Sequence, residues 1–407
     1  MKATMDQYQK AFKNLQAGRK TEPEWLRNLR EKAAVVFAEQ GFPTVRDEVW
    51  RYTDLTPLRE ISFEISGAQS EVQVEGLSAG VQVLSMTEAL KAFPEVLEKH
   101  FGQNSGYDKD PFVALNTAFL NGGVFVRIPD GVVLKEPVRI TYVAESGPER
   151  SLVNPRTFVL MGKGSRAALV EIYKASGESS YFTNSVSEFI LGEGAALEHA
   201  KVQQEGLGAF HVASNRVVQA RGSRFLSLSV SVGSRLMRHG CRVELAGEET
   251  ECTLNGLSLT EKDQHHDYQT FIDHAKPSGK SRQLFKGLLA GNSRGVFTGK
   301  VLVRKDAQHT DAAQTNKNIL LSDEAKVDAR PQLEILADDV KCSHGAAVGQ
   351  LAEDAIFYLK SRGIDEAKAG RMLAQGFAQD VIDVSVTGPL KEEILRILND
   401  KLEKLFD

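Results

Sequence analysis

The sequence has few of the features that mark secreted, membrane-spanning or zinc-binding proteins. It contains only three cysteines, Cys241, Cys252 and Cys342, and this odd set without a C-x-x-C pair does not indicate a disulfide framework or a structural zinc site. No apolar run approaches the roughly 18 residues that a membrane helix requires, and the N-terminal segment lacks the apolar stretch of a secretion signal. We therefore expect a cytoplasmic protein with reduced thiols and no membrane partner.

Signals for nucleic-acid binding and for catalysis are also missing. Fifty basic residues against fifty-four acidic ones give a formal net charge of −4, so we expect no nucleic-acid partner. The chain has no phosphate-binding loop of the G-x-x-x-x-G-K-[ST] type, no G-x-S-x-G elbow and no H-E-x-x-H motif. Two Gly-x-Gly segments, at residues 162–164 and 192–194, lack the third glycine of a dinucleotide site and are interpreted as β-turns. The sequence predicts a protein that is not an enzyme.

The apolar periodicity changes twice along the chain and divides it into three regions. Residues 1–110 are predicted to be mainly helical, because apolar residues in the segments 7–15 and 24–39 lie three or four positions apart. Residues 111–344 instead show short runs with period-two alternation, which indicates strands. Residues 345–407 return to a helical pattern. We therefore predict a mainly β fold with helical regions at both ends.

The strands of the middle region are separated by glycine turns at intervals of about 25 to 33 residues, near Gly131, Gly164, Gly194, Gly222 and Gly247. A drifting repeat of this length is typical of a solenoid, in which each turn buries its apolar face against its neighbours. A parallel β-helix is favoured over a β-sandwich, whose turns usually recur every 8–12 residues. The stretch 262–280 does not fit the repeat and is expected to be an excursion.

Two groups of residues could bind a metal. His265 and His266 are adjacent beside Asp267, so on a strand they would face opposite sides and could not easily hold one ion; a solvated loop is the alternative that we favour. Cys342 and His344 are two positions apart and would share one strand face. A thiolate beside an imidazole suits iron or a cluster fragment, although a buried cysteine and a hydrogen-bonded histidine would give the same pattern. Cys241 and Cys252 are predicted to be buried apolar fillers.

The C-terminal region contains amphipathic helices, including one after Asp365 and one over residues 390–406. Their apolar stripes exceed what a small bundle can bury internally. Two readings stay open at this point, a partner-binding surface and a cap on the end of the solenoid.

Three segments resemble motifs of the SufB/SufD family of iron–sulfur cluster assembly proteins. The segment Leu333–Ala346, which contains Cys342 and His344, resembles the family's C-terminal signature. Asp47–Thr53 and Thr310–Asn316 are similar to two further family motifs. The resemblance covers nearly the whole chain and implies a right-handed parallel β-helix between an N-terminal and a C-terminal helical region.

The resemblance also implies a function. It implies a non-enzymatic scaffold that pairs with a SufB-type subunit, or with itself, and binds a SufC-type ABC ATPase through residues 345–407. His344 and Cys342 would be candidate ligands at the subunit interface for iron or a nascent iron–sulfur cluster, held transiently and shared with the partner. SufB-like chains carry a cysteine where Asn316 stands here, so the chain is most similar to the SufD branch. The sequence carries no signal for or against a flavin.

Two other functions fit parts of the pattern. A β-helix enzyme that cleaves polysaccharides would need clustered carboxylates or basic residues on one exposed face and, usually, a secretion signal. A homodimeric storage or carrier protein would use the same β-helix surface to pair with itself.

Overall fold

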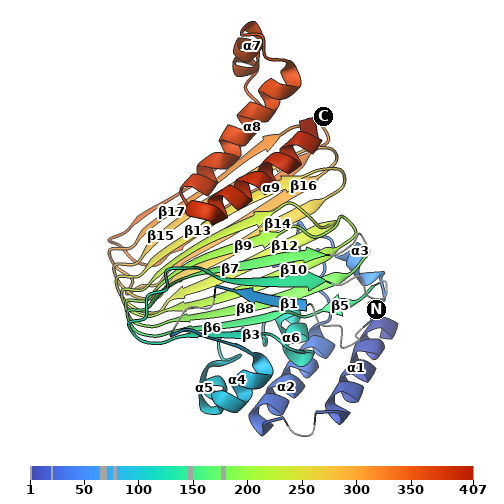
Figure 1. The fold of residues 1–407 in the computed structure, drawn as a ribbon, viewed down its shortest axis with the longest axis vertical. Coiled ribbons are helices and arrows are strands. Elements are labelled where there is room, and N and C mark those ends of the chain that lie inside the picture. Colours follow the sequence, from blue (N-terminus) through green and yellow to red (C-terminus); the bar gives the residue numbers. More distant parts are fainter. Residues whose placement is uncertain are drawn as a thin grey trace.

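Strands occupy the middle of the chain and helices both of its ends (Figure 1). The computed structural model describes residues 2–19, 22–64, 71–76, 80–144, 150–175 and 180–406. The helices of the N-terminal region are α1 (Lys2–Ala17), α2 (Glu24–Gln40), the 3-10 turn η1 (Glu48–Trp50), α3 (Thr56–Arg59), α4 (Met86–Ala92), α5 (Pro94–His100) and α6 (Pro111–Ala118). Those of the C-terminal region are α7 (Glu353–Ser361), α8 (Glu366–Asp383) and α9 (Gly388–Phe406).

The strands form two sheets that face each other across a closed interior. Sheet 1 contains, in spatial order, β1 (Glu71–Glu75), β4 (Val138–Ala144), β7 (Arg166–Ala175), β9 (Ala196–Gln203), β11 (Arg224–Ser231), β13 (Glu251–Thr260), β15 (Lys280–Leu289), β17 (Asp311–Leu320) and β19 (Lys341–Gly349). Sheet 2 contains β2 (Gln82–Ser85), β3 (Val124–Ile128), β6 (Arg156–Met161), β8 (Phe182–Leu191), β10 (Phe210–Gln219), β12 (Leu236–Leu245), β14 (His265–His274), β16 (Arg294–Val303) and β18 (Lys326–Ile335), with β5 (Leu152–Val153) beside β8.

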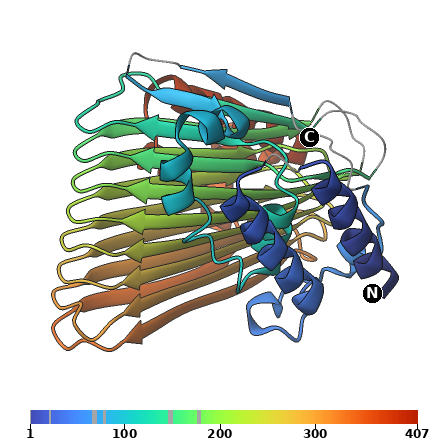
Figure 2. The same ribbon diagram turned by 90° about the horizontal axis from the view of Figure 1, so that it is seen from below.

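Consecutive strands from β7 onward alternate between the sheets, so neighbours within a sheet come from successive turns of the chain. They pair in parallel and in register, as when Phe189 on β8 lies beside Val217 on β10 and then Val243 on β12. Among the described strands, those of the first turn differ, because β1 and β2 pair antiparallel with β4 and β3. Figure 2 shows the stacked turns. The predicted parallel β-helix is confirmed, and the β-sandwich is excluded.

Glycine shapes the turns in the way that the repeat predicts. Gly164, Gly194 and Gly222 have φ values of 65°, 66° and 65°, a backbone conformation that glycine adopts without a side-chain clash. The turn near Gly247 is built differently, because the left-handed residue there is Glu249 with a φ of 58°. Gly247 serves close packing between turns, since a Cβ on it would lie 2.1 Å from the backbone nitrogen of Arg221.

The stretch 262–280 is not an excursion, and this prediction was wrong. Residues 265–274 form β14, which pairs along its whole length with β12 on one side and β16 on the other. The sequence pattern did not predict this strand, because it carries polar residues on both faces where apolar ones were expected. These polar residues, among them His266 and Asp267, have hydrogen-bond partners within the protein.

The helical regions cover the outer faces of the two sheets (Figures 1 and 2). Apolar residues of the N-terminal region, such as Phe37 and Phe112, pack with Phe182 and Phe210 of sheet 2. Helices α8 and α9 pack on the outer face of sheet 1, where their apolar stripes meet those of the strands. Lys286 on β15 fixes α8 there, since its Nζ donates to the carbonyl of Phe377 at 2.8 Å.

The observed strands and helices can be compared with the three regions that the sequence predicts. The parallel strands of the solenoid run from Val124 to Gly349, so β19 extends past residue 344, where the β region was expected to end. Within the described residues, no helix has the length and apolar character needed to cross a membrane.

Candidate functional site

The solenoid has one end at which both sheets finish in a full-length strand. Strand β19 is the last strand of sheet 1, and β18 is the last strand of sheet 2. Three large apolar side chains at this end are exposed: Ile335 (40%), Leu336 (56%) and Val348 (50%). At the opposite end, the short antiparallel strands β1 and β2 complete the sheets. The end formed by β18 and β19 is called the open end below.

Cys342 and His344 both lie on β19 at the open end. They pair in register with Ala312 and Gln314 of β17, which are 2% and 1% exposed and face the interior of the solenoid. Because side chains that are paired in register on neighbouring parallel strands point to the same face of a sheet, Cys342 and His344 project from the interior face of the last turn. The predicted shared face is therefore present. His344 is exposed, and Cys342 is half-buried against an apolar cluster that contains Val301 and Ala312.

The thiol of Cys342 is protonated at neutral pH, whereas a metal is bound by the thiolate. Burial raises the pKa of the Cys342 thiol, so the proton stays on the sulfur at neutral pH and must leave before the sulfur binds a metal. Within the described part of the chain, no three or more histidine, cysteine, aspartate or glutamate side chains are grouped to hold a metal ion. Cys342 and His344 could supply two ligands, whereas an iron–sulfur cluster usually has four.

The interior just below His344 is polar. Gln314, its neighbour in register, is buried, and neither polar atom of its amide has a hydrogen-bond partner among the described residues. Room for this amide exists because residue 299 is glycine, where a Cβ would lie 1.9 Å from the Gln314 Nε2. Asn316, two residues after Gln314 on β17, is also buried. Its side-chain amide donates to the carbonyl of Phe285 at 3.2 Å. It holds a hydrogen-bonded amide where SufB-like chains are expected to have a thiol.

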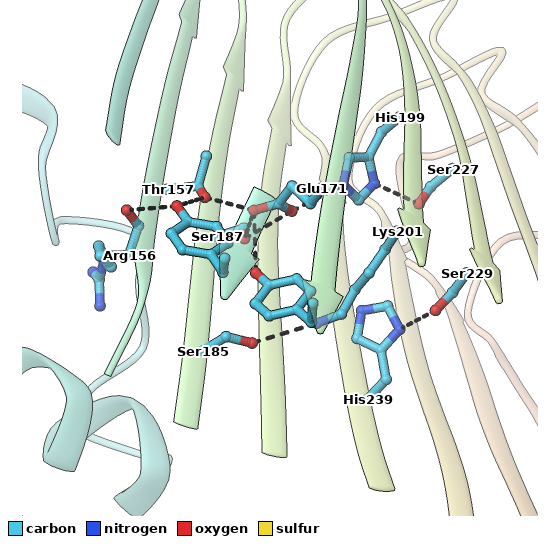
Figure 3. Close-up of polar contacts among 12 residues, drawn as sticks. Arg156, Thr157, Glu171, Ser185, Ser187, His199, Lys201, Ser227, Ser229 and His239 are labelled. Atoms are coloured by element: carbon cyan, nitrogen blue, oxygen red, sulfur yellow. Dashed lines mark hydrogen bonds and ion pairs between the residues drawn. The ribbon is translucent and has the colours of Figure 1, made fainter. Parts of the chain in front are cut away.

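A second polar cluster lies deep inside the solenoid (Figure 3). Its centre is Glu171, whose carboxylate accepts hydrogen bonds from Thr157 at 2.5 Å, Ser187 at 3.0 Å and the Nε2 of His199 at 3.0 Å. The other ring nitrogen of His199 lies 2.9 Å from the hydroxyl of Ser227 on the next turn. This cluster joins strands of both sheets through polar contacts.

The charges of this cluster compensate one another. Burial alone would raise the pKa of Glu171, but the hydrogen bond from His199 and the charges of His199 and Lys201 hold it at about 2. Burial lowers the pKa of Lys201 to about 8, against the opposing effect of Glu171 and Glu205. The Lys201 ammonium lies 4.3 Å from the ring centre of Tyr173. All of these groups are buried, so the charge of each depends on the partners that the other turns supply.

Sequence reasoning missed this cluster. The available signal was a charged or imidazole residue at an inward position of an alternating strand, as at Glu171, His199 and Lys201. Such residues are rarely buried without partners. The partners, however, lie on other turns and are not neighbours in sequence.

The His265–Asp267 segment has a structural role. Asp267 and His265 face outward, where the Thr53 hydroxyl donates to Asp267 Oδ2 at 2.5 Å and lies 3.0 Å from His265 Nε2. Arg238 forms an ion pair with the same Asp267 oxygen and donates to the carbonyl of Val49 at 2.7 Å. The segment 47–53, one of the motifs singled out in the sequence, therefore docks the N-terminal region on sheet 2.

His266 faces the interior and is held in one neutral form. Its Nε2 lies 2.8 Å from the Gly233 carbonyl, which can only accept, so this nitrogen carries the proton. Its Nδ1 therefore accepts from the Ser258 hydroxyl at 2.7 Å. Burial lowers the pKa of His266 to about 3. The two histidines point to opposite faces, as expected for neighbours on a strand. The solvated loop favoured for them is wrong, because both lie on β14 and His266 and Asp267 are buried.

Acid should destabilise the protein partly through His266. Its folded pKa of about 3 lies below the unfolded value of about 6.5, so between these values the unfolded chain binds a proton that the folded chain does not. The stability that His266 contributes is present at neutral pH and is lost as the pH falls from about 6.5 toward 3. Replacing His266 by Gln should reduce the slope of unfolding free energy against pH between 4.5 and 5.5 by about 1.4 kcal/mol per pH unit.

Urea denaturation at several pH values measures this slope. The control is His309→Gln, which removes an exposed histidine at a turn (66% exposed side chain). An unchanged slope in His266→Gln would show that His266 takes up its proton equally in both states.

The C-terminal helices present a second exposed surface. On α7, Phe357 is 74% exposed and Tyr358 is 57% exposed. Figure 1 shows α7 and the start of α8 projecting beyond the sheet that the rest of α8 covers. The stripes of α8 and α9 that the sequence offered as a docking surface are not free, because Ala378, Val381 and Leu398 are buried against sheet 1.

Comparison with known proteins identifies the family. Residues 142–377 match the model described as "SUF system FeS cluster assembly, SufBD core domain", and residues 2–76 and 66–140 match "SufBD protein N-terminal region". A SufBD family iron–sulfur cluster assembly protein of Synechocystis is 31% identical, with 91% of each chain covered. The Escherichia coli iron–sulfur cluster assembly protein SufD is 28% identical, over 95% of this chain and 94% of its own.

A plant relative is equally similar. The chloroplastic protein ABCI7 of Arabidopsis thaliana is 31% identical, over 88% of this chain and 82% of its own. The core-domain model covers more than half of the chain, and the relatives match along nearly all of it. The chain therefore belongs to the SufBD family of iron–sulfur cluster assembly proteins.

Proposed function

We propose that this chain is a non-enzymatic, SufD-type scaffold subunit of an iron–sulfur cluster assembly complex. In this proposal it pairs through its open end with a SufB-type subunit and binds a SufC-type ATPase through its C-terminal helices. His344 and Cys342 contribute to a site for iron or a nascent cluster that the partner completes. The observation that carries the proposal is the position of both side chains on the end strand β19.

The two end strands differ in how readily they would pair with another chain. Strand β18 carries Pro331 and the charged residues Lys326, Asp328, Arg330 and Glu334, which are features that discourage edge pairing. Strand β19 has the sequence KCSHGAAVG, in which Lys341 is the only residue of fixed charge. A long end strand of small and apolar residues suits addition of a strand from a partner. Pairing at β19 would place the partner's groups beside His344.

A SufD-type identity is supported by two observations. The first is the asparagine at position 316, whose amide is buried and hydrogen-bonded, so the thiol expected of a SufB-type chain is missing there. The second is the 28% identity to a protein named SufD over nearly the full length of both chains. A scaffold without that thiol would depend on its partner for most of the sulfur ligands.

The surface proposed for the ATPase is smaller than the sequence indicated. Because sheet 1 covers the stripes of α8 and α9, the exposed side chains of α7 are the best candidates for contact with a partner. Aromatic residues are enriched in the centres of protein interfaces. Phe357 and Tyr358 are therefore proposed as contacts with the SufC-type subunit.

Two single substitutions test the assembly. Val348→Asp places a charge at the open end and should abolish co-purification with a SufB-type subunit while binding of the SufC-type subunit is kept. Phe357→Asp should have the reverse effect, with at least a tenfold loss of affinity for the SufC-type subunit. Burying an unpaired charge at an interface costs several kcal/mol, which accounts for both losses.

The matched control is Val35→Asp on α2, which changes an equally exposed valine (54%) away from both surfaces. Normal binding of both partners by Val348→Asp and Phe357→Asp would contradict the proposed interfaces. Light scattering on the isolated chain separates the homodimer alternative: a dimer that Val348→Asp converts to a monomer would show self-pairing through the same strand.

A further inference from the structure

A groove on the outer face of sheet 2 is separate from β19 and from the C-terminal helices. It has a volume of about 270 Å³ and lies between the sheet and two segments of the N-terminal region, Val49–Trp50 and Lys109–Phe112. Its floor is made by outward-facing residues of β10, β12, β14, β16 and β18. This volume is near the lower end of the range for small-molecule sites.

The floor carries a row of cations in register. Arg216 on β10 lies beside Arg242 on β12, which lies beside Phe271 on β14 and then Lys300 on β16. Adjacent strands are about 4.8 Å apart, so the row places three positive side chains along roughly 14 Å of the groove, with one aromatic ring between them. Arg216 and Arg242 lie directly opposite each other, an arrangement of like charges that destabilises a sheet.

Arg242 has unused hydrogen-bonding capacity. Its neighbours in the row are paired: Arg216 Nη2 lies 2.9 Å from Asp110 Oδ2, and Lys300 Nζ lies 2.6 Å from Glu334 Oε2. The guanidinium of Arg242 stacks 4.0 Å from the ring centre of Phe271, and no hydrogen bond or ion pair joins it to another described residue. Partial burial, and then repulsion by Arg216, lower its pKa, against the attraction of Asp273 and Glu244. The stacked guanidinium is therefore held in place with hydrogen-bond donors that no described residue uses.

Gly240 deepens the groove beside this row. It lies in the middle of β12, where glycine weakens a strand and often marks the close approach of a ligand. Packing does not require glycine here, since a Cβ would meet only the carbonyl oxygen of Ala213 at an ordinary 3.6 Å. The missing side chain leaves a depression between Arg238 and Arg242.

We propose that this groove binds a small molecule that carries two or more phosphate groups. A guanidinium fork recognises a phosphate through two parallel hydrogen bonds, and Arg242 offers such a fork. Arg216 and Lys300, on either side, would exchange their present carboxylate partners Asp110 and Glu334 for further phosphate oxygens, which is why a ligand with several linked negative charges fits the row better than a single carboxylate. This site is independent of the proposed scaffold function, because its residues lie neither on β19 nor on α7.

Calorimetric titration of the full-length chain with inorganic pyrophosphate tests the proposal, with inorganic phosphate as the comparison. Pyrophosphate should bind at 150 mM salt and at least tenfold more tightly than phosphate. Arg242→Gln should weaken pyrophosphate binding by at least about tenfold, the size expected for loss of a charge-assisted hydrogen bond. Gly240→Ala should also weaken it while the melting temperature stays unchanged or rises.

The control is Arg224→Gln, which removes an exposed arginine on the other sheet that pairs with Glu251 at 3.4 Å. It should leave the affinity unchanged. Lack of pyrophosphate binding, equal affinity for phosphate and pyrophosphate, or equal binding by all three variants would each overturn the proposal. None of these results depends on partner subunits or on cluster formation, so they are distinguishable from failure of the proposed function.

Discussion

Replacing Arg156 by Met is expected to lower the free energy of unfolding by about 3–5 kcal/mol, the cost of breaking a buried ion pair from one side. Arg156 is fully buried on β6, and its Nη2 donates to Glu188 Oε1 on β8 at 2.5 Å. Its Nη1 donates to the side-chain oxygen of Asn116 on α6 at 3.0 Å, and its guanidinium lies 4.9 Å from the ring centre of Phe101. One side chain thus connects the N-terminal region to the first turns of the solenoid.

Methionine keeps most of the apolar stem, so the loss reports on charge and hydrogen bonds more than on volume. Urea denaturation followed by circular dichroism measures the change. The double variant Arg156→Met with Glu188→Gln should be more stable than Arg156→Met alone, because it removes the carboxylate left unpaired in the interior. A loss below about 1 kcal/mol for Arg156→Met would mean that water or a rearranged neighbour satisfies Glu188.

The solenoid could be predicted from the sequence because its two main signals are local. Alternation within a strand and glycine at the turns, as at Gly164 and Gly194, can be recognised without knowing which strands pair. The stretch 262–280 was misassigned because its polar residues are buried through distant partners. Asp267 meets Thr53, which is 214 residues away, and His266 meets Gly233 on the preceding turn.

The candidate site was predictable only in part. The shared face of Cys342 and His344 follows from strand geometry, and the structure places both on β19. That β19 is an end strand depends on where the stack of turns stops, which no local pattern specifies. The sequence also could not show what covers the apolar stripes of α8 and α9. The same stripe would result whether the chain's own sheet or a partner protein covers it.

The buried cluster around Glu171 shows the same limit. His199 and Ser227 lie 28 residues apart and meet because they occupy matching positions on successive turns. Register between turns would have to be known to one residue before such a contact could be predicted. The sequence shows only the turn centres, and the distance between them varies from about 25 to 33 residues. The register between turns could therefore be predicted only approximately.

His344→Ala is expected to reduce cluster formation by the assembled complex strongly, to less than about a tenth of the normal yield, whereas Cys342→Ala should keep most of it. His344 is exposed at the open end, where a partner's ligands could reach it, and imidazole binds iron as a neutral group. Cys342 is half-buried, and burial raises the pKa of its thiol, so its sulfur would have to lose both a proton and its packing against the buried cluster that contains Val301 and Ala312.

The most direct test of the scaffold proposal is cluster absorbance per complex, reconstituted from this chain, a SufB-type subunit and a SufC-type ATPase with iron and a sulfur source. Each variant is first shown to be folded by circular dichroism and bound to both partners by size-exclusion chromatography, and Ser343→Ala, between the two candidate ligands, serves as the control. The proposal predicts loss of the cluster signal for His344→Ala, with near-normal signals for Cys342→Ala and Ser343→Ala. A normal signal from a folded, fully assembled His344→Ala complex would contradict it.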